Sequence, residues 1–309
     1  MAFDFEKMLQ TIKERQWSLA DVDWNAPGAE TMSAGQRERM RPFMADLVWI
    51  EHIGARGFAS LTTKAPTPVL AEIYRYFHAE EQKHANAELA LMRRWGMLGN
   101  EELMPEPNIN IRMAIAMLDK FGDDLPLSSL VTVIPLLECA LDGALVKFLL
   151  DEVEDPVCHE VFAHINSDES RHLAVDFQVM EQLGGGPVRK LLIETLGTLK
   201  PQVILALLVV FVPLLNRTRD NLVLMGLSEQ RLYNAMLRYV KVGSRSPATL
   251  RIPVYRLLRR QALAMTDRSH PYHRFLADPM VRATGFVPAR VLGRPQSWAG
   301  QLTADPVAS

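Results

Sequence analysis

The pattern of apolar and polar positions along the chain is helical almost throughout. Apolar residues recur at three- and four-residue spacing over long stretches, and the strict alternation of half-buried β-strands is nearly absent. This pattern predicts an all-α protein in which several long helices each bury one face.

Four long helices are predicted, and three of them begin at a clear capping signal. Ser33 with Gln36 forms a capping box, in which each side chain bonds the backbone of the other residue. Thr67 and Asp155 each stand directly before a proline, the order typical of an N-cap followed by the first helical turn. Pro135 lies inside the helix that lacks such a signal and should kink its axis or open a backbone bulge. The four predicted helices span residues 33–62, 67–98, 127–151 and 155–186.

The rest of the chain is divided around these helices. Residues 1–32 are interpreted as an N-terminal arm with one short helix, residues 33–186 as a four-helix bundle, and residues 187–309 as a helical extension that packs on the bundle. A short helix is also expected near residues 110–121. The tail beyond about residue 270 is expected to be irregular.

Composition excludes some classes of function. The chain is 48% hydrophobic and 23% charged, which is ordinary for a globular protein. Its formal net charge of −2 gives no general attraction to nucleic acid. The two cysteines form no Cys-x-x-Cys motif or disulfide framework, and no basic segment followed by an apolar run opens the chain. We therefore expect a cytoplasmic protein that does not bind nucleic acid.

The longest apolar run covers residues 203–215 and contains Pro213. It is shorter than the ~20 residues that a bilayer-spanning helix needs. A buried helix, a subunit interface and an element at a membrane surface all remain open for it.

The spacing Glu-x-x-His occurs twice within the predicted long helices. Glu81 and His84 stand in the sequence EEQKH, and Glu169 and His172 stand in DESRH. Residues three apart project from the same face of a helix, about 5–6 Å apart at Cβ. A carboxylate and an imidazole at this spacing can bind one metal ion as neighbouring ligands.

Each motif has a partner glutamate on the preceding long helix. Glu51 lies 30 residues before Glu81, and Glu138 lies 31 residues before Glu169. Both stand among apolar or small residues, where an uncompensated carboxylate is costly. Two divalent cations would neutralise the four carboxylates, so the repeated pattern predicts a buried two-metal site.

These motifs resemble the ferritin-like di-iron carboxylate superfamily over roughly residues 35–183. The similarity is greatest to its larger oxygen-activating branch: acyl-carrier-protein desaturases, ribonucleotide reductase small subunits and related di-iron oxygenases. The resemblance implies a ferritin-like four-helix bundle with additional C-terminal helices. It further implies that two glutamates bridge the metals and that each metal has one more glutamate and one histidine. The implied bridging residues are Glu81 and Glu169, and the implied terminal pairs are Glu51 with His84 and Glu138 with His172.

The resemblance also suggests residues that support the ligands. Asp168 and Glu80 precede the two motif glutamates, where the family has a carboxylate that accepts a hydrogen bond from a ligand histidine. For Glu80, solvent exposure is an alternative interpretation. Arg171 is expected to pair with such a carboxylate. Glu88 and Asp142 fall on the ligand-bearing faces and are candidates for proton donors, or for acids that are simply solvated.

The function expected from this resemblance is a di-iron oxygenase or oxidase. Two iron ions, with manganese as an alternative, would activate O₂ to hydroxylate, desaturate or N-oxidise a hydrophobic or carrier-bound substrate. The chain has no rubredoxin-like cysteine quartet and no flavin fingerprint, so a separate ferredoxin or reductase would supply electrons. A homodimer is expected by analogy alone. Two alternatives stay open: a ferroxidase or peroxide-handling protein without an organic substrate, and a scaffold that has lost activity.

A second signal lies in the predicted extension. Residues 230–266 contain eight basic residues and no acidic residue. Such a block attracts an anionic partner or an anionic membrane surface, although a solvated face is the simpler interpretation. The basic residues are Arg231, Arg238, Lys241, Arg245, Arg251, Arg256, Arg259 and Arg260.

Overall fold

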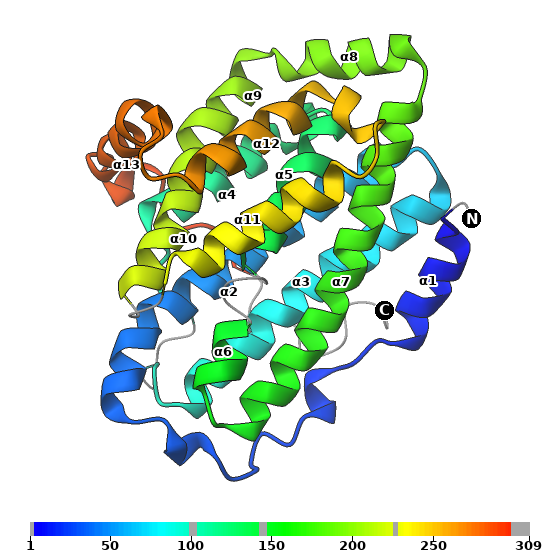
Figure 1. Cartoon of the computed structure of the whole chain (residues 1–309). Coiled ribbons are helices and arrows are strands. Elements are labelled where there is room, and N and C mark those ends of the chain that lie inside the picture. Colours follow the sequence, from blue (N-terminus) through cyan, green and yellow to red (C-terminus); the bar gives the residue numbers. More distant parts are fainter. Residues whose placement is uncertain (1–2, 99–103, 142–146, 225–227, 298–309) are drawn as a thin grey trace.

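The computed structural model describes residues 3–98, 104–141, 147–224 and 228–297, and within these ranges it contains helices and no strand (Figure 1). The predicted all-α fold is therefore confirmed. The long helices are α2 (Ala34–Lys64), α3 (Pro68–Arg94), α5 (Leu127–Leu141) and α7 (Pro156–Gly185). The other helices are α1 (Phe5–Glu14), α4 (Ile109–Phe121), α6 (Lys147–Glu152), α8 (Val188–Thr198), α9 (Pro201–Leu205), α10 (Val212–Leu224), α11 (Gln230–Gly243), α12 (Pro253–Met265) and α13 (Asp278–Gly285).

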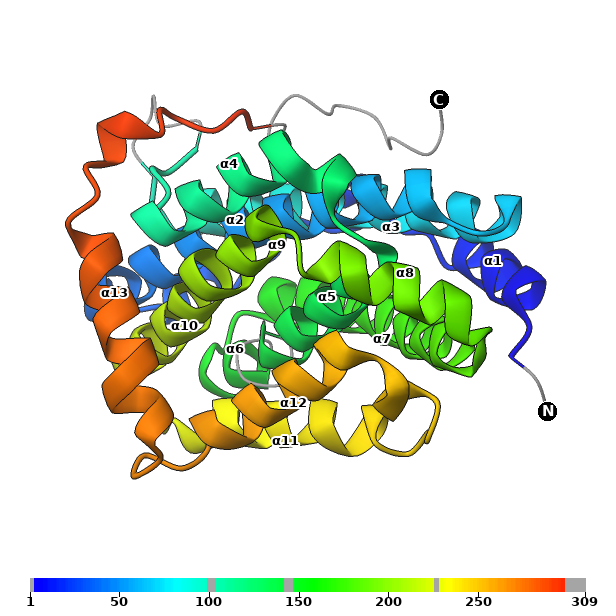
Figure 2. The same cartoon turned by 90° about the horizontal axis from the view of Figure 1, so that it is seen from above.

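The helices are arranged in layers around the four long ones. Helices α2 and α3 pack along their whole length, with α4 against α2, and α5 packs on α7 in the next layer (Figure 2). Helices α11 and α12 cover the outer side of α5, and α1 lies against α3. The four long helices therefore enclose an interior in which side chains from all four can meet.

The predicted starts of three long helices are confirmed at the level of single hydrogen bonds. The Ser33 side chain accepts from the backbone N–H of Gln36, whose own side chain completes the capping box. Thr67 caps α3 by accepting from the N–H of Leu70, and Asp155 caps α7 by accepting from the N–H of Val157. Each cap satisfies a backbone donor that has no partner within the helix.

Helix α3 ends four residues earlier than predicted, at Arg94. Gly96 has φ = 65°, the left-handed conformation that glycine adopts at little cost, and this reverses the chain. The N–H of Met97 closes the turn by bonding the carbonyl of Met92 at 2.9 Å. The predicted range of 67–98 did not take Gly96 into account.

Two further boundaries differ from the predictions. The predicted helix 127–151 is described as α5 and α6, and residues 142–146 between them lie outside the described ranges. The expectation of an irregular tail was wrong for residues 273–285, which form a π-helical segment, His273–Ala277, followed by α13. The residues His273 and Ala277 are buried there, and the segment packs against α10 and α4. Asp278 and Pro279 in the first turn of α13 are also a local helix-start signal, which the prediction of an irregular tail overlooked.

The apolar run 203–215 is helical throughout, and we call it the helical wall. It comprises part of α9, a π-helical segment (Ala206–Phe211) and the first turn of α10. Val203 and Phe211 on one side are buried, whereas Ile204 and Leu205 on the other are exposed. No helix in the described ranges is both long and apolar enough to traverse a bilayer.

Asp155 connects three parts of the structure. It is fully buried and accepts hydrogen bonds from the Arg94 guanidinium at 2.7 Å and the Trp95 indole at 2.8 Å. Arg94 also donates to the carbonyls of Trp24 and Ala26 in the N-terminal arm. The cap of α7 is therefore also the anchor for the end of α3 and for the arm.

Replacing Asp155 by Ala should lower the free energy of unfolding by about 3 kcal/mol, because it removes a helix cap and leaves a buried guanidinium without its carboxylate. Urea unfolding followed by circular dichroism measures this loss. The matched control is Asp151→Ala, which removes a largely exposed ion pair with Arg231 and should cost about 1 kcal/mol or less. Equal losses for the two variants would contradict the role assigned to Asp155.

Candidate metal centre

The six side chains predicted as metal ligands all point into the interior enclosed by the four long helices. One glutamate comes from α2 and one from α5, and a Glu-x-x-His pair comes from each of α3 and α7. Every one of the six is buried. The residues are Glu51, Glu81, His84, Glu138, Glu169 and His172.

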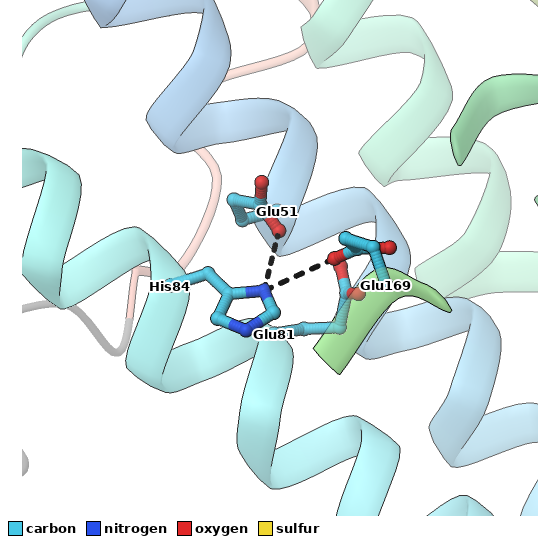
Figure 3. A group of neighbouring side chains, drawn as sticks. All are labelled: Glu51, Glu81, His84 and Glu169. Atoms are coloured by element: carbon cyan, nitrogen blue, oxygen red, sulfur yellow. Dashed lines mark ion pairs between the residues drawn. The ribbon is translucent and has the colours of Figure 1, made fainter. Parts of the chain in front are cut away.

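Four of these side chains form the first group. The ligand atoms of Glu51, Glu81, His84 and Glu169 lie within 4.8 Å of one another. His84 Nδ1 is 3.6 Å from Glu51 Oε2 and 3.1 Å from Glu169 Oε1. Figure 3 shows the carboxylates of Glu51 and Glu169 converging on the His84 ring.

The second group shares two carboxylates with the first. His172 Nδ1 is 3.3 Å from Glu81 Oε1, 3.3 Å from Glu169 Oε2 and 3.6 Å from Glu138 Oε1. Glu81 and Glu169 therefore belong to both groups, whereas Glu138 and His172 belong to the second alone. Two adjacent sites with two common carboxylates are the geometry in which those carboxylates can bridge two ions.

The chemistry of these donor atoms fits a two-metal cofactor. Oxygen and imidazole ligands in this number suit iron or manganese. Several of the atoms are buried and have no hydrogen-bond partner among the described residues, which is costly in the absence of a cation. These atoms are Glu81 Oε1, both oxygens of Glu138, Glu169 Oε2 and the Nδ1 atoms of His84 and His172. The individual ligand roles stay predictions, but the structure has two buried Glu/His groups able to hold such a cofactor.

The outer nitrogen of each histidine is held by the acidic residue of the opposite motif. His84 Nε2 lies 3.0 Å from Asp168 Oδ2, and His172 Nε2 lies 2.9 Å from Glu80 Oε2. Each carboxylate favours the tautomer that leaves Nδ1 free to face the metal. Glu80 is fully buried, which excludes its interpretation as a solvent-exposed acid.

Arg171 joins these two carboxylates. Its Nη2 contacts Asp168 Oδ1 and lies 3.2 Å from Glu80 Oε1. The N-terminal arm adds two contacts that the sequence analysis did not predict. Trp17 Nε1 donates to Asp168 Oδ2 at 2.8 Å, and Gln16 Nε2 donates to Glu80 Oε1 at 2.7 Å. No motif marks either residue, because each meets its partner only through the tertiary fold.

In the absence of metal, protons take the place of the cations. Burial and the neighbouring carboxylates raise the pKa of Glu81 well above its usual value, and burial raises the pKa of Glu138 to about 7. Burial lowers the pKa values of His84 and His172, but the surrounding carboxylates outweigh it and raise both. Burial also opposes ionisation of Glu169, yet the two histidines hold its pKa at about 2.

Two further acids interact electrostatically with the ligand side chains, one near His84 and one near His172. Glu88 follows His84 by four residues, and Asp176 follows His172 by four residues. Both are buried, and burial together with nearby carboxylates raises the pKa of each well above its usual value. The sequence analysis named Glu88 but missed Asp176, although the same spacing would have found it. The other predicted proton donor, Asp142, lies outside the described residues.

The metal-free protein should lose stability as the pH rises from about 5 to about 8. The unfolded glutamates release their protons near their ordinary pKa of 4.5, whereas the folded site retains protons on groups whose pKa is raised. The folded state thus binds more protons in this window, and its stability falls with pH.

Because metals displace these protons, added Mn(II) should raise the melting temperature more at pH 8 than at pH 5. Thermal unfolding with and without metal measures both trends, and metal-free stability that rises with pH would contradict them.

Asp168→Ala and Glu80→Ala should each weaken one of the two metal sites by about 10- to 100-fold, because each leaves one histidine without its orienting carboxylate. Titration with Mn(II), followed by metal analysis, should then show one tight and one weak site in each variant. Glu72→Ala removes a half-exposed acid paired with Lys13 and serves as the control with two unchanged sites. Unaltered affinity at both sites in Asp168→Ala would refute its positioning role.

Comparison with known proteins gives one structural likeness. No family model and no curated protein matches the chain. Among solved structures, a mutant of an R2-like ligand-binding oxidase with an aerobically reconstituted Mn/Fe cofactor aligns with 12% sequence identity and a TM-score of 0.46. The alignment covers 84% of this chain and 93% of that chain. The two-metal centre follows from the six side chains of this protein and not from this likeness: the helical bundle and its paired Glu/His groups are the arrangement of the ferritin-like di-metal carboxylate proteins.

Proposed function

We propose that this protein is a non-haem di-iron oxidoreductase that uses O₂ to oxidise a small apolar substrate. The support comes from the two-metal centre and from an apolar cavity that adjoins it. The cavity has a volume of about 90 Å³ and is lined by α2, α4, α5 and the helical wall formed by α9, the π-helical segment and α10. Of the sixteen residues that line it, Ser129 alone has a polar side chain.

Gly54 on α2 is the point at which the cavity adjoins the metal centre. It lines the cavity, and a Cβ atom added to it would lie 1.8 Å from Glu81 Oε2. No side chain can therefore stand at this position between the cavity and the shared carboxylate. This juxtaposition is the observation that carries the proposal, because a substrate in the cavity would approach the metals through a gap that only glycine leaves open.

The protein's own groups have distinct tasks in such a reaction. Bound iron would supply the redox chemistry needed to activate O₂. Asp168 and Glu80 orient the two histidines, while Glu88 and Asp176 hold protons close to the centre at neutral pH. The apolar lining binds a hydrophobic substrate by removing its surface from water, and excludes water from the oxidation.

The electrons that O₂ reduction requires would come from a separate donor, such as a ferredoxin or a reductase. The chain has two cysteines, too few for a rubredoxin-like centre. Hydroxylation and desaturation both fit an apolar cavity beside the metals, and a carrier-bound acyl chain is one form that the substrate could take.

Filling the cavity should lower substrate oxidation at least tenfold without removing the metals. Ala114 is a buried cavity residue on α4, so Ala114→Phe places a ring in the space that the substrate needs. With Fe(II), O₂ and a chemical reductant, mass spectrometry of apolar test substrates should show the gain of one oxygen or the loss of two hydrogens for the native protein, and at least tenfold less product for this variant.

Val291→Phe adds a ring of the same size at an exposed position and is the matched control. Iron content should be unchanged in both variants. Rapid oxidation of Fe(II) by the native protein, with no product from any organic substrate and no effect of Ala114→Phe, would instead identify a ferroxidase. If the folded protein binds no metal, both the oxidase and the ferroxidase function are ruled out.

A further inference from the structure

Helix α8 presents an unusual apolar face to solvent. Four of its apolar side chains and that of the C-cap residue, Leu199, are between 56 and 71% exposed. The face continues onto the helical wall that follows, where three more are between 38 and 52% exposed. Apolar patches of this extent on a soluble protein mark sites of interaction. The residues are Val188, Leu192, Ile193 and Leu196 on α8, Leu199 at its C-cap, and then Ile204, Leu205 and Leu208.

Exposed cations lie beside this apolar face. Helix α12 packs beside α8, and α11 packs beside α12, as both views show (Figures 1 and 2). Their outward positions alternate leucines with basic residues, and residues 230–266 contain no acid. The exposed leucine and basic positions are Leu237, Arg238 and Lys241 on α11 and Arg256, Leu257, Arg260 and Leu263 on α12.

The charge of α8 has the same sign. Arg189 and Lys190 at its start and Lys200 just beyond its end are exposed. Its acidic residue, Glu194, is turned toward the protein, where it accepts a hydrogen bond from the backbone N–H of Ser128 at 2.9 Å. Apolar and basic side chains therefore dominate what this region presents to solvent. We call α8 and the outward positions of α11 and α12 the α8 face.

We propose that the α8 face docks the protein on the surface of an anionic lipid bilayer. Leucine, isoleucine and valine side chains would enter the boundary between headgroups and acyl chains, while arginine and lysine bind the lipid phosphates. A second copy of the chain is a poorer occupant, because pairing this face with itself would bring cations against cations. No described helix can cross a bilayer, so the protein would lie on the surface.

The helical wall connects this docking surface to the cavity. Val203, Val210 and Phe211 line the cavity, while Ile204 and Leu205 on the same stretch of helix are exposed as part of the apolar face. Docking would therefore bring one wall of the cavity close to the lipid. The proposal itself does not depend on the oxidation reaction, because binding to lipid is measured without metal or substrate.

The test is flotation of the full-length protein with vesicles of phosphatidylcholine alone or mixed with phosphatidylglycerol. The native protein should bind the anionic vesicles at least tenfold more strongly than the neutral ones, and added salt should weaken the binding. Leu192→Gln with Leu196→Gln should lower binding about tenfold or more by removing apolar contacts. Arg256→Gln with Arg260→Gln, on a different helix, should lower it by a similar factor.

Phe275→Gln with Phe286→Gln is the matched control. These rings are 72 and 85% exposed. Phe275 lies in the π-helical segment before α13 and Phe286 directly after α13. Helix α13 lies away from α8 (Figure 1), so the loss of the two rings should leave binding unchanged. Circular dichroism of each variant checks that these substitutions at exposed positions leave the fold intact. Equal binding to neutral and anionic vesicles, or an equal loss in the control, would overturn the proposal. A native dimer that dissociates in the Leu192/Leu196 variant and binds no vesicles would assign the face to a second copy instead.

Discussion

The structure depends on cancelling the charge of four carboxylates that meet in the interior of a helical bundle. Glu51, Glu81, Glu138 and Glu169 are all buried within reach of two histidines. Without metal, protons on raised-pKa groups supply the compensation, and two divalent cations would supply it more completely. The stability of the bundle and its capacity for metal chemistry are therefore consequences of the same electrostatic requirement.

The hydrogen bonds around the metal ligands connect α3 with α7. Each Glu-x-x-His motif carries, one position earlier, the acid that holds the histidine of the opposite motif. Arg171 spans both acids, and the arm closes the network through Trp17 and Gln16. Because every member has a partner from another segment, the histidines are oriented by the assembled fold and by no single helix.

The cavity and the α8 face lie on opposite sides of one helical segment. The helical wall from α9 to α10 has a buried side toward the cavity and an exposed apolar side toward solvent. A protein that oxidises a hydrophobic molecule needs both a dry chamber beside its metals and a route by which an insoluble substrate reaches it. The proposed function and the proposed docking surface meet these two needs through one stretch of helix.

The sequence by itself determined the helical fold, the starts of the four long helices and the residues that the structure brings together at the centre. These are local properties: capping residues bond within one turn, and residues three apart share a helix face whatever surrounds them. Glu88 and Asp176 show the same regularity, since both stand four residues after a histidine.

Only the tertiary structure decided which distant segments support the site. Trp17 meets Asp168 across 151 residues of chain, and Gly54 adjoins both the cavity and Glu81, although no spacing rule connects them. The place of the helix at 278–285 is likewise set by its packing against α10 and α4. Contacts between segments far apart depend on how whole helices pack, and that information is spread over every residue at their interfaces.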